Sequence, residues 1–144
     1  MGVNEIERRL CQRFKIPGAT VSYRITRLFA AKSGNDEEFC PVLDLSRGGI
    51  RFLTQKPLKF KSKVTLQLSI PGERVPIDIK GRVRWSTFNA GKSYKYQAGV
   101  QINPYGLEKH QNVPQTLTKI VALESKFIEP GAPSDPPKPG EFSA

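Results

Sequence analysis

Three arginines near the amino end are spaced so that their side chains can act on one ligand. Arg9 and Arg13 are four residues apart, and Arg8 stands directly before them. A guanidinium is a planar fork of N–H donors, which matches phosphate oxygens and the O6/N7 edge of guanine. This segment therefore predicts contacts to an anion that also carries a purine base.

A second segment, residues 44–49, follows about thirty residues later and brings different chemistry. Asp44 supplies a hydrogen-bond acceptor, Ser46 supplies a small hydroxyl, and Gly48 and Gly49 come next. Glycine lets the backbone turn sharply and approach a ligand closely. Together the two segments predict one binding pocket to which both contribute.

Charge constrains the class of partner more than it constrains the fold. The 144-residue chain carries 23 Lys and Arg residues against 13 Asp and Glu residues, a formal net charge of +10. A positive field of this size favours nucleic acid, nucleotides or anionic membranes, without choosing among them. The length suits a single hydrophobic core and a tail.

Few residues could support catalysis or hold a metal. His110 is the only histidine, and Cys11 and Cys40 are too few to complete a zinc site. The sequence contains no Gly-rich phosphate loop of the nucleotide-hydrolase type. We therefore expect no enzyme activity, no metal and no cofactor, and we expect two small, partly buried thiols.

Targeting and membrane signals are also missing from the sequence. The first residues are acidic and lack the apolar stretch of a secretory signal. No apolar run approaches the roughly 20 residues that a transmembrane helix needs. The expectation is a cytoplasmic protein without a membrane span.

Hydrophobic periodicity predicts a mainly β fold. Six short segments with strand character are separated by turn residues: 19–26, 39–45, 50–53, 62–70, 77–85 and 94–102. In the first of them, Val21 and Tyr23 point to one side while Ser22 and Arg24 face water. Trp85 lies in the fifth segment, where packing in the core is favoured over stacking on a base. Such a series is typical of a small antiparallel barrel or sandwich.

The periodicity changes after Pro104. Pro114 suits the first turn of a helix, and apolar residues then recur at helical spacing as far as Ile128. We interpret this helix as a cover for an open end of the barrel; docking to a partner is the alternative. Residues 129–144 are rich in Pro and Gly and are expected to be disordered.

These features together resemble the PilZ family, bacterial domains that bind the second messenger cyclic di-GMP. Arg9 and Arg13 meet the family's Arg-x-x-x-Arg pattern, and Asp44, Ser46 and Gly49 meet its Asp/Asn-x-Ser-x-x-Gly pattern. The resemblance continues in order to about residue 127. It implies a small six-stranded antiparallel β-barrel with a C-terminal α-helix.

The resemblance also implies a role for each motif residue. Arg9 and Arg13 would divide the contacts to the phosphates and to guanine O6/N7, and Asp44 would accept from guanine N1–H and the exocyclic amine. Ser46 would add a compact donor or acceptor, and Gly49 would keep side-chain bulk away from the ligand. All five therefore become candidate ligand-binding residues.

The resemblance also implies roles for Arg8 and for the segment around it. In this family an arginine directly before the first motif arginine accompanies binding of a stacked ligand dimer, so Arg8 joins the candidate site. Residues 1–18 would form an arm that the ligand orders against a barrel and helix at 19–128. The ordered arm would then signal to a downstream protein partner of unknown identity.

Other interpretations stay open at the level of sequence. The arginines could be a solvated basic face paired with Glu5 and Glu7, and Asp44 and Ser46 could cap their own turn. A basic barrel could bind single-stranded nucleic acid with residues such as Tyr94 and Tyr96, which steep salt dependence would reveal. A PilZ-like adaptor without a ligand is a further alternative. Because both motifs are intact, cyclic di-GMP is favoured over nucleic acid.

Overall fold

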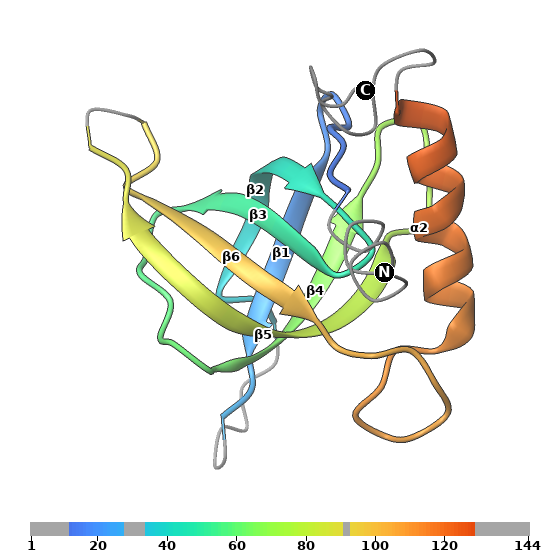
Figure 1. The fold of residues 1–144 in the computed structure, drawn as a ribbon. Helices are drawn as coiled ribbons and strands as arrows, with labels where there is room; N and C mark the ends of the chain where they lie inside the picture. The colour runs from blue at the N-terminus through green and yellow to red at the C-terminus, as the bar shows by residue number, and fades with distance from the viewer. Residues whose placement is uncertain (1–11, 28–33, 91–92, 129–144) are drawn as a thin grey trace, which may run out of the picture.

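Six strands close into one antiparallel barrel, as Figure 1 shows. The computed structural model describes residues 12–27, 34–90 and 93–128. Around the barrel the strands follow the order β1-β2-β3-β6-β5-β4. Their bounds are β1 Thr20–Ile25, β2 Glu37–Leu45, β3 Gly49–Thr54, β4 Lys63–Ser69, β5 Ile77–Phe88 and β6 Tyr96–Ile102, and the helix α2 follows at Pro114–Phe127. The predicted six-stranded barrel with a C-terminal helix is confirmed.

Some of the predicted features lie outside the described residues. They are the arginines Arg8 and Arg9, the thiol of Cys11, and the tail at 129–144. Among the helices of the described residues, none has the length and apolar character needed to cross a membrane.

Alternating side chains build the core, and β5 shows this most clearly. Ile77, Ile79 and Val83 are buried, while Asp78 and Lys80 are exposed between them. A strand with period two can bury one face and hydrate the other. The apolar residues of the six strands therefore fill the barrel, and the charged ones form its outer surface.

The prediction that Ser22 lies on a solvent-exposed face of β1 is wrong. This side chain is buried, and its hydroxyl oxygen accepts a hydrogen bond of 3.0 Å from the backbone N–H of Phe39 on β2. The register of the β1–β2 pair shifts between Val21 and Tyr23, so the ladder is irregular at this point. The hydroxyl takes the place of a regular ladder partner for Phe39.

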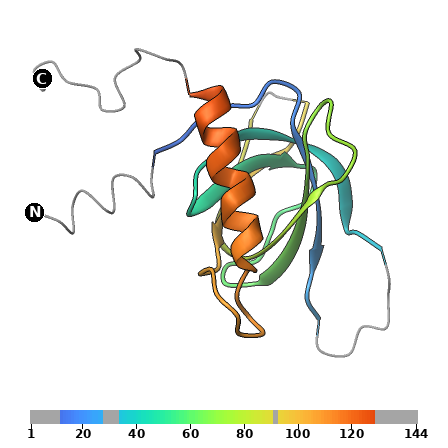
Figure 2. The ribbon, with the colours of Figure 1, turned by 90° about the vertical axis from the view of Figure 1, so that its right-hand side faces the viewer.

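The helix α2 covers one end of the barrel. Ile120 is fully buried, and Leu123 and Phe127 pack against the core. Figure 2 shows α2 running in front of the strands. At this end the helix contacts the turn between β2 and β3, where Glu124 accepts a 2.7 Å ion-paired hydrogen bond from Nε of Arg47.

Tyr105 holds the same turn from a different direction. Its hydroxyl donates a 2.7 Å hydrogen bond to the carbonyl oxygen of Arg47, and its ring packs against the core. Burial raises the pKa of Tyr105 to about 12, so the hydroxyl stays protonated and able to donate at neutral pH. The turn that carries the second motif is thus fixed by α2 and by the segment that leads into it.

Candidate functional site

The segment before β1 enters the barrel wall at Phe14. The N–H of Phe14 donates to the carbonyl oxygen of Leu45 over 2.9 Å, and the N–H of Leu45 donates back to Phe14 over 3.0 Å. The side chains of Phe14 and Ile16 are buried. Arg13 is therefore held beside the end of β2 by its neighbour's backbone pairing and burial.

This pairing places Arg13 against Asp44 of the second motif. Nη1 of Arg13 donates to Oδ1 of Asp44 over 2.7 Å. Arg51 of β3 approaches from the opposite strand, and its Nε lies 2.9 Å from Oδ2 and 3.1 Å from Oδ1, while its Nη2 also donates to Oδ2. The predicted meeting of the two motifs is thus a direct ion pair, to which Arg51 adds a second guanidinium.

Asp44 is a nearly buried carboxylate with two cationic partners. Its side chain is 7% exposed, whereas those of Arg13 and Arg51 are 41% and 37% exposed. Burial acts to raise the pKa of Asp44, but the hydrogen bonds and charges of Arg51 and Arg13 outweigh it and bring the pKa below its usual value. The carboxylate is therefore ionised at neutral pH and holds both arginines in place.

Ser46 stabilises the turn from within. Its Oγ accepts from the N–H groups of Gly48 and Gly49 over 3.2 and 3.1 Å, and its side chain is buried. Its backbone N–H donates to the carbonyl oxygen of Gly49 over 2.8 Å. Among the open interpretations of this residue, capping of its own turn is confirmed.

Space is tight at Gly49. A Cβ at this position would lie 3.2 Å from Nη2 of Arg13 and 3.2 Å from the carbonyl oxygen of Val100. The predicted tight turn is present, but neither Gly48 nor Gly49 has a positive φ, so the turn does not use the left-handed backbone that favours glycine. The absent side chain instead lets the Arg13 guanidinium lie close to the barrel wall.

Trp85 lies on the outer surface, so the prediction of core packing is wrong. Its side chain is 37% exposed. The register of β5 against β6 shifts between Val83 and Trp85, and Trp85 pairs with Gly99. A bulge adds one residue to a strand and reverses the faces of all side chains after it. Continuous alternation through Val83 therefore predicted the wrong face for Trp85.

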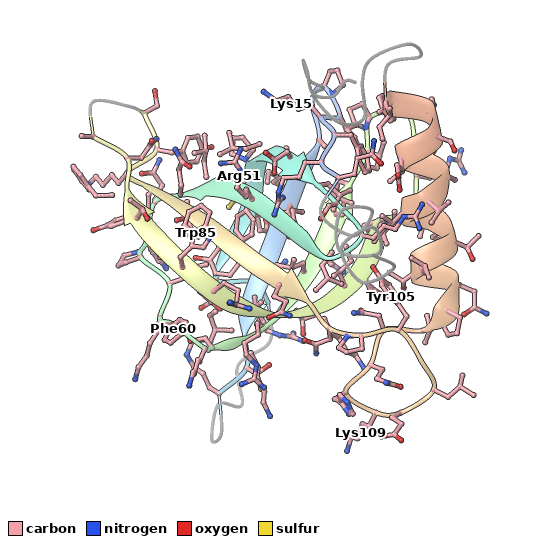
Figure 3. The ribbon with its side chains drawn as sticks, in the orientation of Figure 1. Lys15, Arg51, Phe60, Trp85, Tyr105 and Lys109 are labelled. Carbon is pink, nitrogen blue, oxygen red and sulfur yellow. The ribbon has the colours of Figure 1, made fainter. Side chains whose placement is uncertain are left out.

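The same register aligns four residues across the outer face of the barrel. Asp44 pairs with Arg51, Arg51 with Gly99, and Gly99 with Trp85. Figure 3 shows Arg51 and Trp85 as neighbours on one side of the barrel. Gly99 has no side chain, and a Cβ there would lie 2.3 Å from two atoms of the indole. The indole therefore lies directly against the β6 backbone.

A shallow pocket of about 240 Å³ lies between Arg13 and Trp85. Gly49 and Gly99 form part of its lining, and Arg84 and Gln101 stand at its wall, joined by a 2.7 Å hydrogen bond from the guanidinium to the amide oxygen. We call this the Arg13–Trp85 pocket. It combines a cation, an aromatic face and exposed backbone, which suits an anion with a planar base.

Sequence reasoning identified only part of this site. Arg13, Asp44, Ser46 and Gly49 lie together as expected, whereas Arg8 and Arg9 fall outside the described residues. It missed the contributions of Arg51, Arg84, Trp85 and Gly99, because only strand register brings them to the motifs.

Neither a metal site nor a reactive thiol accompanies the pocket in the described part of the chain. No group of three or more His, Cys, Asp and Glu side chains gathers there in a way that could hold a metal ion. Burial raises the pKa of the Cys40 thiol to about 12, which disfavours the nucleophilic thiolate.

Gly99→Ala should displace the Trp85 indole from the β6 backbone, because the added Cβ cannot share that space. Trp85 is the only tryptophan, so its fluorescence reports on this one contact. We expect a red-shifted emission maximum with little change in circular dichroism. Gly106→Ala is the control, because its added Cβ meets only the movable end of Gln111. An unshifted emission in Gly99→Ala would contradict the assignment.

Asp44→Asn tests the ion pairs through their pH dependence. A carboxylate whose folded-state pKa is depressed contributes stability above its unfolded pKa, and this contribution is lost as pH falls through the folded value. We expect the free energy of unfolding of the variant to be lower than that of the parent protein by on the order of 1–3 kcal/mol at neutral pH. This difference in free energy should become smaller below about pH 4, where the carboxyl of the parent becomes protonated. Urea unfolding at several pH values measures it, with the exposed Asp78→Asn as control. A gap that does not change with pH would contradict the role of the ionised carboxylate.

Comparison with known proteins agrees with this geometry. The family model of the PilZ domain matches residues 7–118, a span that includes both motifs, all six strands and the start of α2. None of the curated proteins searched matches the chain. PilZ domains are ligand-binding receptor domains and are not typically catalytic. Because the match covers most of the sequence, the chain belongs to the PilZ domain family.

Proposed function

We propose that this PilZ domain binds cyclic di-GMP at the Arg13–Trp85 pocket and passes the signal to a downstream protein. The observation that carries the proposal is the ion pair between Arg13 and Asp44, which joins the two family motifs at the edge of that pocket. The family is one of ligand-binding receptors, so we propose a receptor rather than an enzyme. We place it in the bacterial cytoplasm.

Arg13 is suited to a phosphate or to the O6/N7 edge of guanine. A guanidinium carries five N–H donors, and the contact to Asp44 uses one of them. The side chain is 41% exposed and lines the pocket, so other donors can reach a ligand. Because Asp44 orients the guanidinium in advance, less side-chain entropy is lost when the ligand binds.

Trp85 is suited to stack on one guanine. The indole lines the same pocket as Arg13 and is partly exposed. Stacking of a base on an aromatic side chain is worth about 1–3 kcal/mol. An anion bound at Arg13 could therefore place its attached base against Trp85.

Asp44 has a different role from the one implied by resemblance alone. Its two oxygens already accept hydrogen bonds from Arg13 and Arg51. A contact to guanine N1–H would require one of these arginines to release the carboxylate. We propose that Asp44 is a positioning residue, which holds the arginines where the ligand meets them.

The size of the pocket supports a contribution from the arm. At about 240 Å³ it is smaller than the roughly 300–1,000 Å³ of typical small-molecule sites, so it would hold only part of cyclic di-GMP. We assign the remaining contacts to Arg8 and Arg9, a few residues before Arg13 in the chain. Phe14 and Ile16 of the proposed arm are already packed on the barrel. Ligand contacts to Arg8, Arg9 and the barrel would therefore order the part of the arm before Phe14, and this ordered segment would be the output read by a partner.

Arg13→Ala and Arg9→Ala should each weaken cyclic di-GMP binding by more than tenfold, which corresponds to about 1.4 kcal/mol. Each variant removes a cation assigned to the ligand, while the barrel keeps its core. Calorimetric titration measures the affinity, with GTP and cyclic di-AMP as specificity controls. Lys15→Ala is the matched control, because it removes an exposed cation near Arg13 that does not line the pocket.

Two results would contradict the proposal. One is an unchanged affinity in Arg13→Ala or Arg9→Ala. The other is an equal loss of affinity in Lys15→Ala, which would indicate a general effect of net charge.

Arg8→Ala should lower the number of cyclic di-GMP molecules bound per chain without abolishing binding. A stacked ligand dimer presents more phosphate groups than one molecule, and we assign Arg8 to the second molecule. The expected number of ligands per chain falls from two toward one, measured by calorimetry at chain concentrations above the dissociation constant. A value of two in the variant would remove this role from Arg8.

A further inference from the structure

A second and larger groove lies on the outer surface, next to the Arg13–Trp85 pocket. It has a volume of about 950 Å³ and runs along β4 and β5 toward the loop that follows β6. Four cationic side chains line it: Lys63 of β4, Lys80 and Arg82 of β5, and Lys109 of the loop. Figure 3 shows Lys109 on that loop, in the lower part of the view, with Arg51 in the upper part. We call this space the cationic groove.

The charge of the groove is not neutralised by nearby carboxylates. None of its lining residues is acidic. Within the described ranges, Lys63, Arg82 and Lys109 form no ion pair, and the ammonium of Lys80 donates to a neutral acceptor, the carbonyl oxygen of Lys109, over 2.7 Å. Like charges gathered in a concave surface create a strong positive potential there. The groove is therefore suited to an anion.

The cations are arranged as a row. Lys80, Arg82 and Arg84 are successive exposed residues of β5, and Lys63 is the cross-strand partner of Arg82. Alternate residues of a strand are about 6.6 Å apart. A spacing of this order resembles that between neighbouring phosphates of an extended nucleic-acid strand. A polyanion with regular charges can thus meet several of these side chains at once.

The row ends beside Trp85. Gln101 lines the cationic groove and the Arg13–Trp85 pocket, and it accepts the hydrogen bond from Arg84. Trp85 follows Arg84 in the sequence and is partly exposed. A cationic groove with an aromatic platform is the combination by which proteins bind single strands without sequence preference.

We propose that the cationic groove binds single-stranded nucleic acid through its phosphates, with a base on Trp85. This role is additional to the messenger site, with which it shares Trp85, and the phosphate contacts in the groove do not depend on that site. The sequence pI of about 9.9, with four cationic side chains gathered in this groove, fits the electrostatic footprint of a nucleic-acid-binding domain. The placement of these side chains favours a partner that the sequence motifs alone did not.

Fluorescence anisotropy with a labelled oligothymidylate of about 15 nucleotides tests the proposal on the full chain. Each phosphate neutralised on a single strand contributes about −0.7 to the slope of log affinity against log salt. Five cations, the four of the groove and Arg84, thus predict a slope of about −3.5. The triple variant Lys63→Ala/Lys80→Ala/Arg82→Ala should bind at least tenfold more weakly, with a slope less steep by about 2.

Matched controls separate the groove from overall charge and from the messenger site. Lys56→Ala/Lys119→Ala/Lys126→Ala removes three exposed lysines that do not line the groove and should keep the oligonucleotide affinity within about threefold. The groove variant should keep its cyclic di-GMP affinity, and Arg13→Ala should keep its oligonucleotide affinity. The oligonucleotide proposal can therefore fail while the cyclic di-GMP proposal holds, and the reverse is also possible.

Three results would overturn the inference. The first is equal binding loss in the two triple variants. The second is a salt slope near zero in the parent chain. The third is tighter binding to polyglutamate, or to vesicles containing phosphatidylserine, than to the oligonucleotide, which would assign the groove to an acidic peptide or to a membrane.

Discussion

The buried carboxylate of Asp44 is the constraint on which the site depends. A charge at 7% exposure must be paired, and here it is paired by Arg13 from the segment before β1 and by Arg51 from β3. These partners come from segments far apart in the chain, and the carboxylate holds both at one end of the β2–β3 hairpin. The candidate site is thus organised around a carboxylate of the protein itself.

Two glycines shape the Arg13–Trp85 pocket. At Gly49 and Gly99 the absence of a side chain brings the Arg13 guanidinium and the Trp85 indole close to the backbone. An added Cβ at Gly99 would overlap the indole, and one at Gly49 would lie within 3.2 Å of the guanidinium of Arg13. The pocket therefore depends on the absence of side chains at Gly49 of β3 and Gly99 of β6 as well as on the side chains that line it.

The site is also attached to the helix. The turn that Ser46 stabilises includes Arg47, whose side chain pairs with Glu124 of α2 and whose carbonyl oxygen accepts from Tyr105. The residues after Arg47 reach the pocket through Gly48 and Gly49. One short turn therefore contacts the candidate ligand site on one side and the covering helix on the other, so the two are parts of a single packed unit.

The sequence by itself determined the elements and the motif chemistry. Alternation of apolar residues predicted six strands, because each strand must bury one face, and Pro114 with the apolar stripe predicted α2. The spacing within the motifs identified Arg13, Asp44, Ser46 and Gly49. Tertiary structure alone decided which other residues join them, because register and bulges are properties of paired strands. The bulge after Val83 turned Trp85 outward, and β3–β6–β5 pairing placed it in line with Arg51 and Gly99, an alignment that no local pattern encodes.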